Sequence, residues 1–246
     1  DRNSPEFLIE DTHQSLADTK EWLEASAQFG PLVKPIITPR FVPSCTSELM
    51  SGLGNLAEAY NVPVQSHLSE NHGEIEWVAA LHPEAANYTD VYYEHHLMGK
   101  VPTVMAHCIH LSDVEMDRMA ETQTMVSHCP YSNVNLSSGI APIRKLFERK
   151  IPIGLGSDIS GGHIVSMAKV LTEAIGLSKM KWVEVDQMYV PLTLSEAFYM
   201  ATKGGGKFFG KVGSFEKGCE LDALVIDDTT LFDPNERSLE ERLERW

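Results

Sequence analysis

Short polar clusters at the ends of apolar segments hold the residue types that hydrolytic chemistry uses. His67 follows the branched segment 62–66, and Glu70 comes three positions later. A neutral imidazole leaving a buried strand can bind a metal ion, and a nearby carboxyl group can transfer protons in the same pocket. The structural alternative is a histidine hydrogen-bonded at the edge of the core beside a surface glutamate. His67 is therefore a candidate metal ligand and Glu70 a candidate general acid and base.

Two further clusters repeat this placement. His107 closes the apolar segment 103–106, and Asp158 follows the glycine-containing segment 154–156. An aspartate there can bind a divalent metal and accept a proton from its water, or it can cap the helix that follows. Histidines that close successive strands indicate a shared site. His107 and Asp158 are candidate catalytic residues, and Asp158 is also a candidate metal ligand.

Arg40 and Phe41 form a pair after the segment 33–38. An arginine can donate two hydrogen bonds to a planar acceptor, and an adjacent aromatic ring can stack on a heterocycle. The structural alternative is a surface salt bridge and a core phenylalanine. The other clusters make a substrate-binding role the better interpretation. His128 also ends an apolar segment, and we expect it to support the loop that follows.

The elements that must position these residues alternate along the chain. Short segments rich in branched residues predict strands at 33–38, 62–66, 103–106, 125–127 and 151–155. Amphipathic segments between them predict helices at 12–28, 47–60, 74–81, 113–122, 143–149 and 165–179. Such alternation is typical of parallel strands joined by helices. Polar residues converging from several strand ends favour a closed barrel over an open, doubly wound sheet.

The fold class expected is α/β, a (β/α)8 TIM-type barrel of the metal-dependent hydrolase kind. Residues 1–210 would form its larger, C-terminal part, with the N-terminal strands lying ahead of Asp1. Residues 211–246 would hold the start of a small accessory β-sheet, with two short strands within 213–226. A charged helix is expected from Ser238 to Trp246.

Composition excludes several classes of partner. The 35 acidic residues outnumber the 20 basic ones, and the resulting charge of -15 would repel a nucleic-acid backbone. No apolar run approaches the roughly 20 residues that span a bilayer, so no membrane partner is expected. The four cysteines lie far apart without a C-x-x-C pair, which suits a reducing, cytoplasmic environment.

Taken together, these residues resemble the amidohydrolase superfamily, within its purine and pyrimidine deaminase branch. His67, His107 and Asp158 stand in the order of that family's fifth-strand ligand, sixth-strand catalytic histidine and eighth-strand ligand. The segments 128–133 and 136–139 are similar to those of the branch in general. The segments 39–41, 66–71 and 156–158, the last followed by glycines at 161–162, are similar to those of the branch members that act on guanine. The resemblance covers residues 34–226.

The resemblance implies a hydrolase acting on C–N bonds of cyclic amidines, which converts guanine to xanthine and ammonia in purine breakdown. One divalent metal would activate the water, zinc being expected and iron the alternative. Asp158 would bind the metal and help deprotonate the water, which His107 orients. Glu70 would protonate the ring nitrogen beside the amine-bearing carbon. A homodimer is also implied.

The resemblance further implies the substrate contacts. Arg40 would recognise the guanine carbonyl, and Phe41 would pack on the purine. The implied substrate-binding set is Arg40, Phe41, His67, Glu70 and Asp158, and the implied metal ligands are His67 and Asp158.

One part of the family pattern does not occur in this sequence. The family takes two more metal ligands from a His-x-His pair after its first strand, and we expect that pair to lie ahead of Asp1. The alternative functions are a sibling enzyme acting on another aminopurine, a pterin or an S-adenosylhomocysteine-like substrate, and a non-catalytic scaffold. The joint presence of Glu70, His107 and Asp158 argues against a scaffold.

Overall fold

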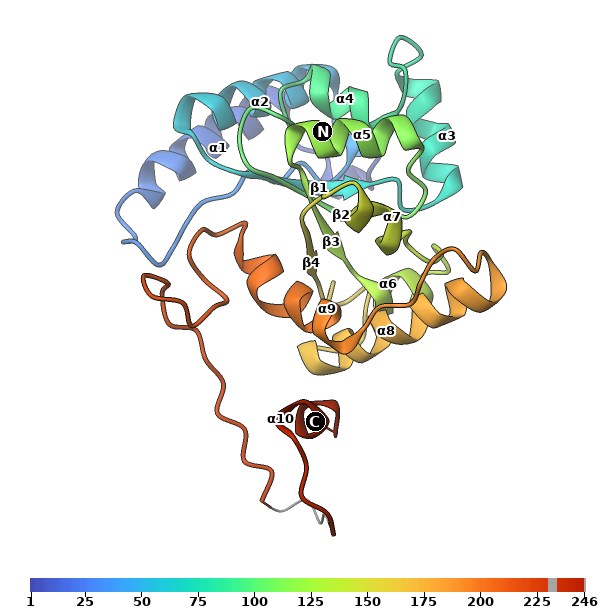
Figure 1. Cartoon of the computed structure of the whole chain (residues 1–246). Coiled ribbons are helices and arrows are strands. Elements are labelled where there is room, and N and C mark those ends of the chain that lie inside the picture. The colour runs from blue at the N-terminus through green and yellow to red at the C-terminus, as the bar shows by residue number, and fades with distance from the viewer. Residues whose placement is uncertain (230–233, 246) are drawn as a thin grey trace.

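The computed structural model describes residues 1–229 and 234–245, in which helices surround a parallel sheet (Figure 1). The strands β1 (Val64–Leu68), β2 (Thr103–His107), β3 (Met125–His128) and β4 (Ile153–Leu155) are paired in chain order. All three pairings are parallel, and helices connect each strand to the next, as parallel pairing requires. The predicted α/β class with a parallel sheet is therefore confirmed.

The strand expected over 33–38 is much shorter in the structure. Only Ile37 pairs with the sheet, through an isolated parallel bridge to Val64. Its amide donates to the Pro63 carbonyl, and its carbonyl accepts from the Gln65 amide, both at 2.9 Å. Pro35 and Pro39 flank this bridge, and proline has no N–H to extend a ladder. The branched residues therefore indicate correctly where the chain meets the sheet, and the two prolines limit its pairing with β1 to one bridge.

Most predicted helices form within a few residues of their expected bounds. They are α1 (Thr12–Ser26), α2 (Ser47–Tyr60), α3 (His72–Leu81), α5 (Asp113–Thr122), α7 (Ile143–Glu148) and α8 (Met167–Glu184). Side-chain caps fix several starts: the Thr46 hydroxyl accepts from the Leu49 amide, and Ser112 and Glu115 form a capping box.

Shorter elements were not predicted because they contain too few turns to show a helical period. The α-helices among them are α4 (Tyr88–Glu94), α6 (Pro130–Asn135) and α9 (Leu194–Tyr199). Two 3-10 turns span Glu6–Leu8 and Val42–Ser44, and a π-helical turn, Met200–Gly204, continues α9.

The C-terminal region differs from expectation. The strands predicted within 213–226 are not formed: this described segment is unpaired, and Leu224 and Val225 are 81% and 99% exposed. A strand needs partners for its backbone N–H and C=O groups along its length. In the described residues only the Cys219 and Glu220 amides of this segment donate to backbone carbonyls, those of Glu216 and Lys211. The trace instead leads away from the sheet (Figure 1). Helix α10 (Leu239–Arg245) confirms the expected terminal helix, with Trp246 outside the described residues.

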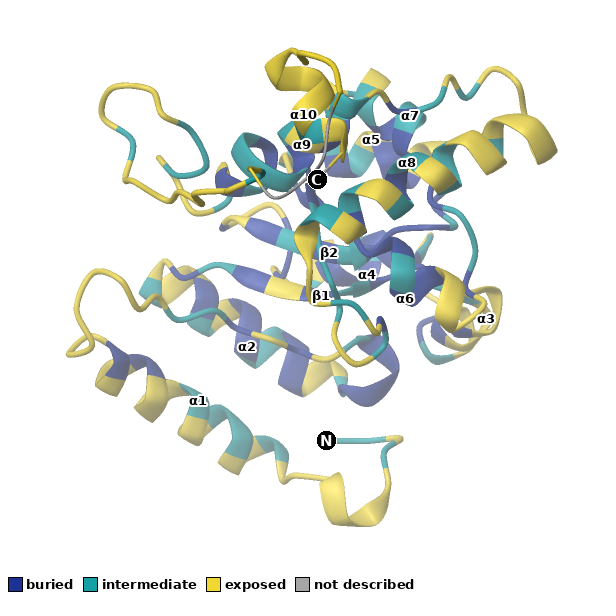
Figure 2. Ribbon diagram, turned by 90° about the horizontal axis from the view of Figure 1, so that it is seen from below, coloured by how far each residue is buried: buried dark blue, intermediate teal, exposed yellow. Residues whose placement is uncertain are grey.

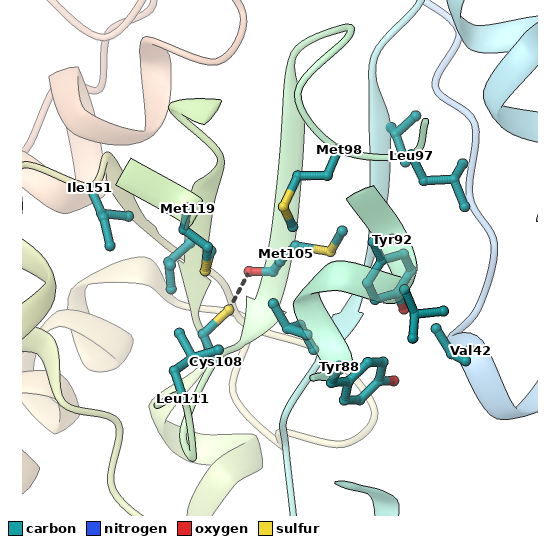
Figure 3. Packing of buried hydrophobic residues seen from close by; sticks show 14 of the residues in the cluster. Val42, Tyr88, Tyr92, Leu97, Met98, Met105, Cys108, Leu111, Met119 and Ile151 are labelled. Atoms are coloured by element: carbon teal, nitrogen blue, oxygen red, sulfur yellow. Dashed lines mark hydrogen bonds between the residues drawn. The ribbon is translucent and has the colours of Figure 1, made fainter. Parts of the chain in front are cut away.

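Much of the hydrophobic core lies between the sheet and the helices that precede β3, and the core continues to Leu146 on α7 and Ala174 on α8. Figure 1 shows α2, α4 and α5 on one side of the sheet, and Figure 2 shows burial concentrated on the facing sides of these elements. Met98, Met105 and Met119 are at most 1% exposed, and in the view of Figure 3 Met105 is drawn between Met119 and Tyr92. Unbranched methionines fill irregular gaps of this kind.

The other face of the sheet borders a cavity of about 840 Å³. Its lining includes Gln65, His67, Val104 and Asp158, so it reaches the carboxyl ends of the strands. Within the described residues, no helix has the length and hydropathy needed to cross a membrane.

Two helical glycines provide a test of this packing. A Cβ at Gly54 in α2 would collide with the His95 carbonyl oxygen, whereas one at Gly176 in α8 would meet no atom within 4 Å. Gly54→Ala should therefore destabilise the protein by about 1–3 kcal/mol, because rigid backbone must move. Gly176→Ala should be neutral or stabilise by up to about 1 kcal/mol, because alanine favours helix. Urea unfolding measures both, and equal effects would contradict the close approach at Gly54.

Candidate active site

The four central residues predicted from the sequence come together at the carboxyl edge of the sheet. His67 lies on β1, Glu70 follows that strand, His107 ends β2, and Asp158 follows β4. The imidazole rings of His67 and His107 are stacked, with centroids 5.4 Å apart and planes 24° apart. The edge therefore unites side chains that are up to 91 positions apart in the chain, from His67 to Asp158.

Two carboxylates approach the same nitrogen of His107. Its Nε2 atom lies 3.6 Å from Glu70 Oε2 and 3.9 Å from Asp158 Oδ2. Both distances exceed a direct hydrogen bond, so the three groups face a common point without bonding one another tightly. His107 is 1% exposed, whereas the Glu70 and Asp158 side chains are 17% and 30% exposed. The Glu70 and Asp158 carboxylates can therefore contact a molecule that enters the site from their side.

Asn133 on α6 fixes the orientation of His107, and the sequence did not single it out. Its Oδ1 atom lies 2.9 Å from His107 Nδ1, and both side chains are buried. An amide oxygen only accepts, so Nδ1 carries the hydrogen and Nε2 is left to exchange protons. The only signal for Asn133 in the sequence was its place in the segment 128–133.

Backbone conformation marks the same residues. His107 and Asp158 have φ values of 69° and 46°, and Ser69, next to Glu70, has 49°. Residues with side chains adopt this left-handed region rarely, and such conformations cluster at sites where side chains must be aimed. The local backbone thus turns sharply after each strand and directs the functional groups toward the common edge.

His67 is oriented by the backbone of Arg40. The Arg40 carbonyl accepts from His67 Nδ1 at 2.5 Å, which leaves Nε2 free of that bond. Ser66 strengthens the junction by donating to the Pro39 carbonyl at 2.8 Å, and the Tyr92 hydroxyl donates to the His67 carbonyl at 2.8 Å. The segment that contains Arg40 therefore holds His67 in a tautomer suited to a metal ion.

The side chains of Arg40 and Phe41 lie at the margin of the site. Arg40 is exposed, and the half-buried Phe41 packs edge-on against Trp77, with centroids 6.3 Å apart. Among the described residues, no hydrogen bond or ring contact joins either side chain to His107. Their roles in substrate binding stay predictions.

A buried glutamate supports the loop that carries Glu70. Glu74 is 6% exposed, and its Oε2 atom accepts from the Glu70 amide at 2.9 Å. The Tyr88 hydroxyl donates to Glu74 Oε1 at 2.6 Å. Burial raises the pKa of Tyr88 well above its ordinary value, so this phenol remains a neutral donor. The sequence pattern places Glu74 at a helix start and does not indicate this supporting role.

The donor set matches part of a metal site. A neutral imidazole nitrogen from His67 and a carboxylate from Asp158 are ligand types that zinc and iron accept. Residues 1–229 and 234–245 contain no group of three or more His, Cys, Asp or Glu side chains arranged to hold a metal ion. Catalytic zinc sites use three protein ligands. His67 and Asp158 therefore fit as members of such a site and do not complete it.

Comparison with known proteins identifies the family of the chain. Residues 4–243 match the Amidohydrolase family. The chain belongs to this family. Among curated amidohydrolase relatives, guanine deaminase of Dictyostelium discoideum is 47% identical over 92% of this chain and 51% of its own length. Guanine deaminase of Escherichia coli is 37% identical over 93% of this chain and 51% of its own length.

A solved structure of this family extends the comparison. Guanine deaminase from C. acetobutylicum, with guanine in its active site, is 52% identical and superposes with a TM-score of 0.96. The match covers all of this chain and 58% of that structure. This amidohydrolase chain spans about half the length of the curated relatives it matches.

His128 provides a pH-dependent test of the packing beneath the site. It is 1% exposed, and its Nδ1 atom has no partner in the described structure. Burial, with a smaller contribution from His107, lowers the pKa of His128 from 6.5 to about 3. Between these values the unfolded chain binds more protons than the folded one, so stability falls as the pH is lowered.

We expect this histidine to contribute a slope of up to about 1.4 kcal/mol per pH unit below pH 6.5. His128→Gln should remove that contribution because glutamine does not titrate. His13→Gln, at an exposed histidine, is the control and should leave the slope nearly unchanged. Urea unfolding at several pH values measures how the free energy of unfolding changes with pH. An unaltered slope in His128→Gln would show that His128 does not stay neutral in the folded protein at these pH values.

Proposed function

We propose that this chain carries the proton-transfer residues of a guanine deaminase, which hydrolyses guanine to xanthine and ammonia. The observation that carries the proposal is the approach of Glu70 Oε2 and Asp158 Oδ2 to His107 Nε2 at one strand edge. Two carboxylates beside a histidine supply both a proton acceptor and a proton donor. The amidohydrolase relatives named guanine deaminase support the choice of substrate.

In the proposed reaction, a water oxygen adds to the carbon that bears the exocyclic amine, and Asp158 accepts the proton that the water loses. His107, held by Asn133, hydrogen-bonds and orients that water. Glu70 protonates the neighbouring ring nitrogen. A metal ion held by His67, Asp158 and further ligands would lower the pKa of the attacking water.

The second half of the reaction releases ammonia. The proton of the newly formed hydroxyl passes through Glu70 to the amine, the C–N bond breaks, and the carbonyl of xanthine forms. Transfer of the proton held by Asp158 back to Glu70 restores the starting state. Glu70 must therefore release and accept protons in turn, which suits a partly exposed carboxyl group 3.6 Å from the His107 imidazole.

Substrate recognition in this proposal comes from the segment that holds His67. The exposed Arg40 guanidinium would donate to the guanine carbonyl, and the Phe41 ring would pack on the purine. Because the Arg40 carbonyl binds His67, the recognition segment and the metal ligand share one backbone. This shared backbone would hold the bound purine at a fixed position relative to the reacting groups.

We also propose that the four strands are part of a (β/α)8 barrel whose remaining strands and metal ligands come from sequence outside this chain. The cavity beside the sheet would then be the barrel interior. Zinc as the metal, a homodimeric assembly and a cytoplasmic location stay predictions.

The substrate assignment is tested by ammonia release. Full-length protein should act on guanine with a kcat/KM at least about 100-fold above that for adenine, a pterin or S-adenosylhomocysteine. A substrate that lacks the hydrogen-bonding groups of guanine would leave polar groups of the site unpaired, which is costly. Preference for another ring would indicate a sibling enzyme of the family. Absence of turnover on all of them in metal-loaded protein would favour a non-catalytic scaffold.

The role of Glu70 is tested by Glu70→Gln, which keeps the size of the side chain and removes its exchangeable proton. We expect kcat to fall by about 100-fold or more, as for loss of a general acid and base. Glu76→Gln, at an exposed position of α3, is the control and should retain normal activity. Full activity in Glu70→Gln would remove Glu70 from the mechanism.

A further inference from the structure

We propose that Ser138 is a positioning residue that determines which oxygen of Glu70 carries the transferred proton. The inference rests on the proposed function. It concerns a serine in the loop between α6 and α7, distant from Glu70 in sequence and buried to 7% exposure.

The two oxygens of the Glu70 carboxylate have different partners. Ser138 Oγ donates to Oε1 at 2.8 Å, whereas Oε2 lies 3.6 Å from His107 Nε2. The backbone amide of Glu70 is held separately by Glu74. Rotation of the Glu70 carboxylate would break the bond to Ser138, so this hydroxyl keeps Oε2 directed toward His107.

This arrangement favours protonation at Oε2. With the proton on Oε2, Oε1 has carbonyl character and continues to accept from the serine hydroxyl. With the proton on Oε1, that oxygen would donate to Ser138 Oγ, and the serine hydrogen would lose the one acceptor that the described structure gives it. The bond to Ser138 therefore places the mobile proton on the oxygen that faces the reacting groups, which is where a general acid needs it.

Ser138 is itself held from two sides. Its amide donates to the Asn133 carbonyl at 2.8 Å, and its carbonyl accepts from His110 Nε2 at 2.8 Å. The His110 ring packs against the His72 ring with centroids 4.0 Å apart. The serine is thus fixed independently of Glu70, as a positioning group must be.

The turn from Asn133 to Ser138 consequently orients both proton carriers. Its first residue binds His107 Nδ1, its last binds Glu70 Oε1, and the backbone bond between the two closes the turn. A shift of this turn would move the acid and the histidine together. This accounts for the burial of two polar side chains outside the candidate catalytic set, Asn133 on α6 and Ser138 in the loop that follows.

The test uses full-length protein and guanine. Ser138→Ala should lower kcat about 10-fold, with a smaller change in KM, because the hydrogen bond that orients the acid is lost. Ser138→Thr keeps the hydroxyl and should recover most of kcat. Ser137→Ala removes an exposed neighbouring hydroxyl and should leave kcat unchanged. If Ser138→Ala does not fold, Ser138→Cys, which has a weaker donor of similar shape, provides the same comparison.

A double-mutant cycle distinguishes positioning from general support of the fold. If Ser138 acts through Glu70, then Ser138→Ala should have little further effect on kcat in the Glu70→Gln background. An equal loss in both backgrounds, or an unchanged kcat in Ser138→Ala, would overturn the role of Ser138. Wild-type protein that does not turn over guanine would instead contradict the proposed function, so the two failures are distinguishable.

Discussion

The parallel backbone ladder from β1 to β4 is the constraint on which the rest of the structure depends. In its register Leu68 pairs with His107 and His128 pairs with Leu155, so successive strands end at nearly one level. Parallel pairing sends every strand end to the same edge. Residues that follow those ends meet there whatever their separation in sequence. An antiparallel pairing of the same segments would send half of these groups to the opposite edge.

The ladder fixes the location of the reacting groups, and a surrounding layer of hydrogen bonds fixes their orientation. The Arg40 carbonyl sets the tautomer of His67, and Asn133 sets that of His107. Glu74 and Ser138 hold the backbone and one oxygen of Glu70. Each supporting group comes from a different loop or helix from the group it holds. Orientation of the reacting groups therefore depends on the packing of α3, α6 and the loops that carry Arg40 and Ser138, which links stability to the proposed chemistry.

The sequence was informative wherever a local pattern decides the structure. Strand ends and long amphipathic helices were predicted because apolar periodicity and caps are local. His67, His107 and Asp158 were found because they lie at or shortly after the carboxyl ends of such strands. Asn133, which acts on a residue 26 positions away, depends on tertiary contact and could not be found in this way. The predicted strands within 213–226 failed for the same reason, because strand pairing needs a partner that the local pattern does not specify.

We propose that guanine reacts at the point faced by Glu70, His107 and Asp158. A crystal structure of the full-length, metal-loaded Glu70→Gln protein with guanine bound tests it most directly. The account predicts that the ring nitrogen beside the amine-bearing carbon lies within about 3.2 Å of the residue 70 side chain, with the amine-bearing carbon on the side of His107 and Asp158. Guanine bound with that carbon away from these three residues would contradict the account.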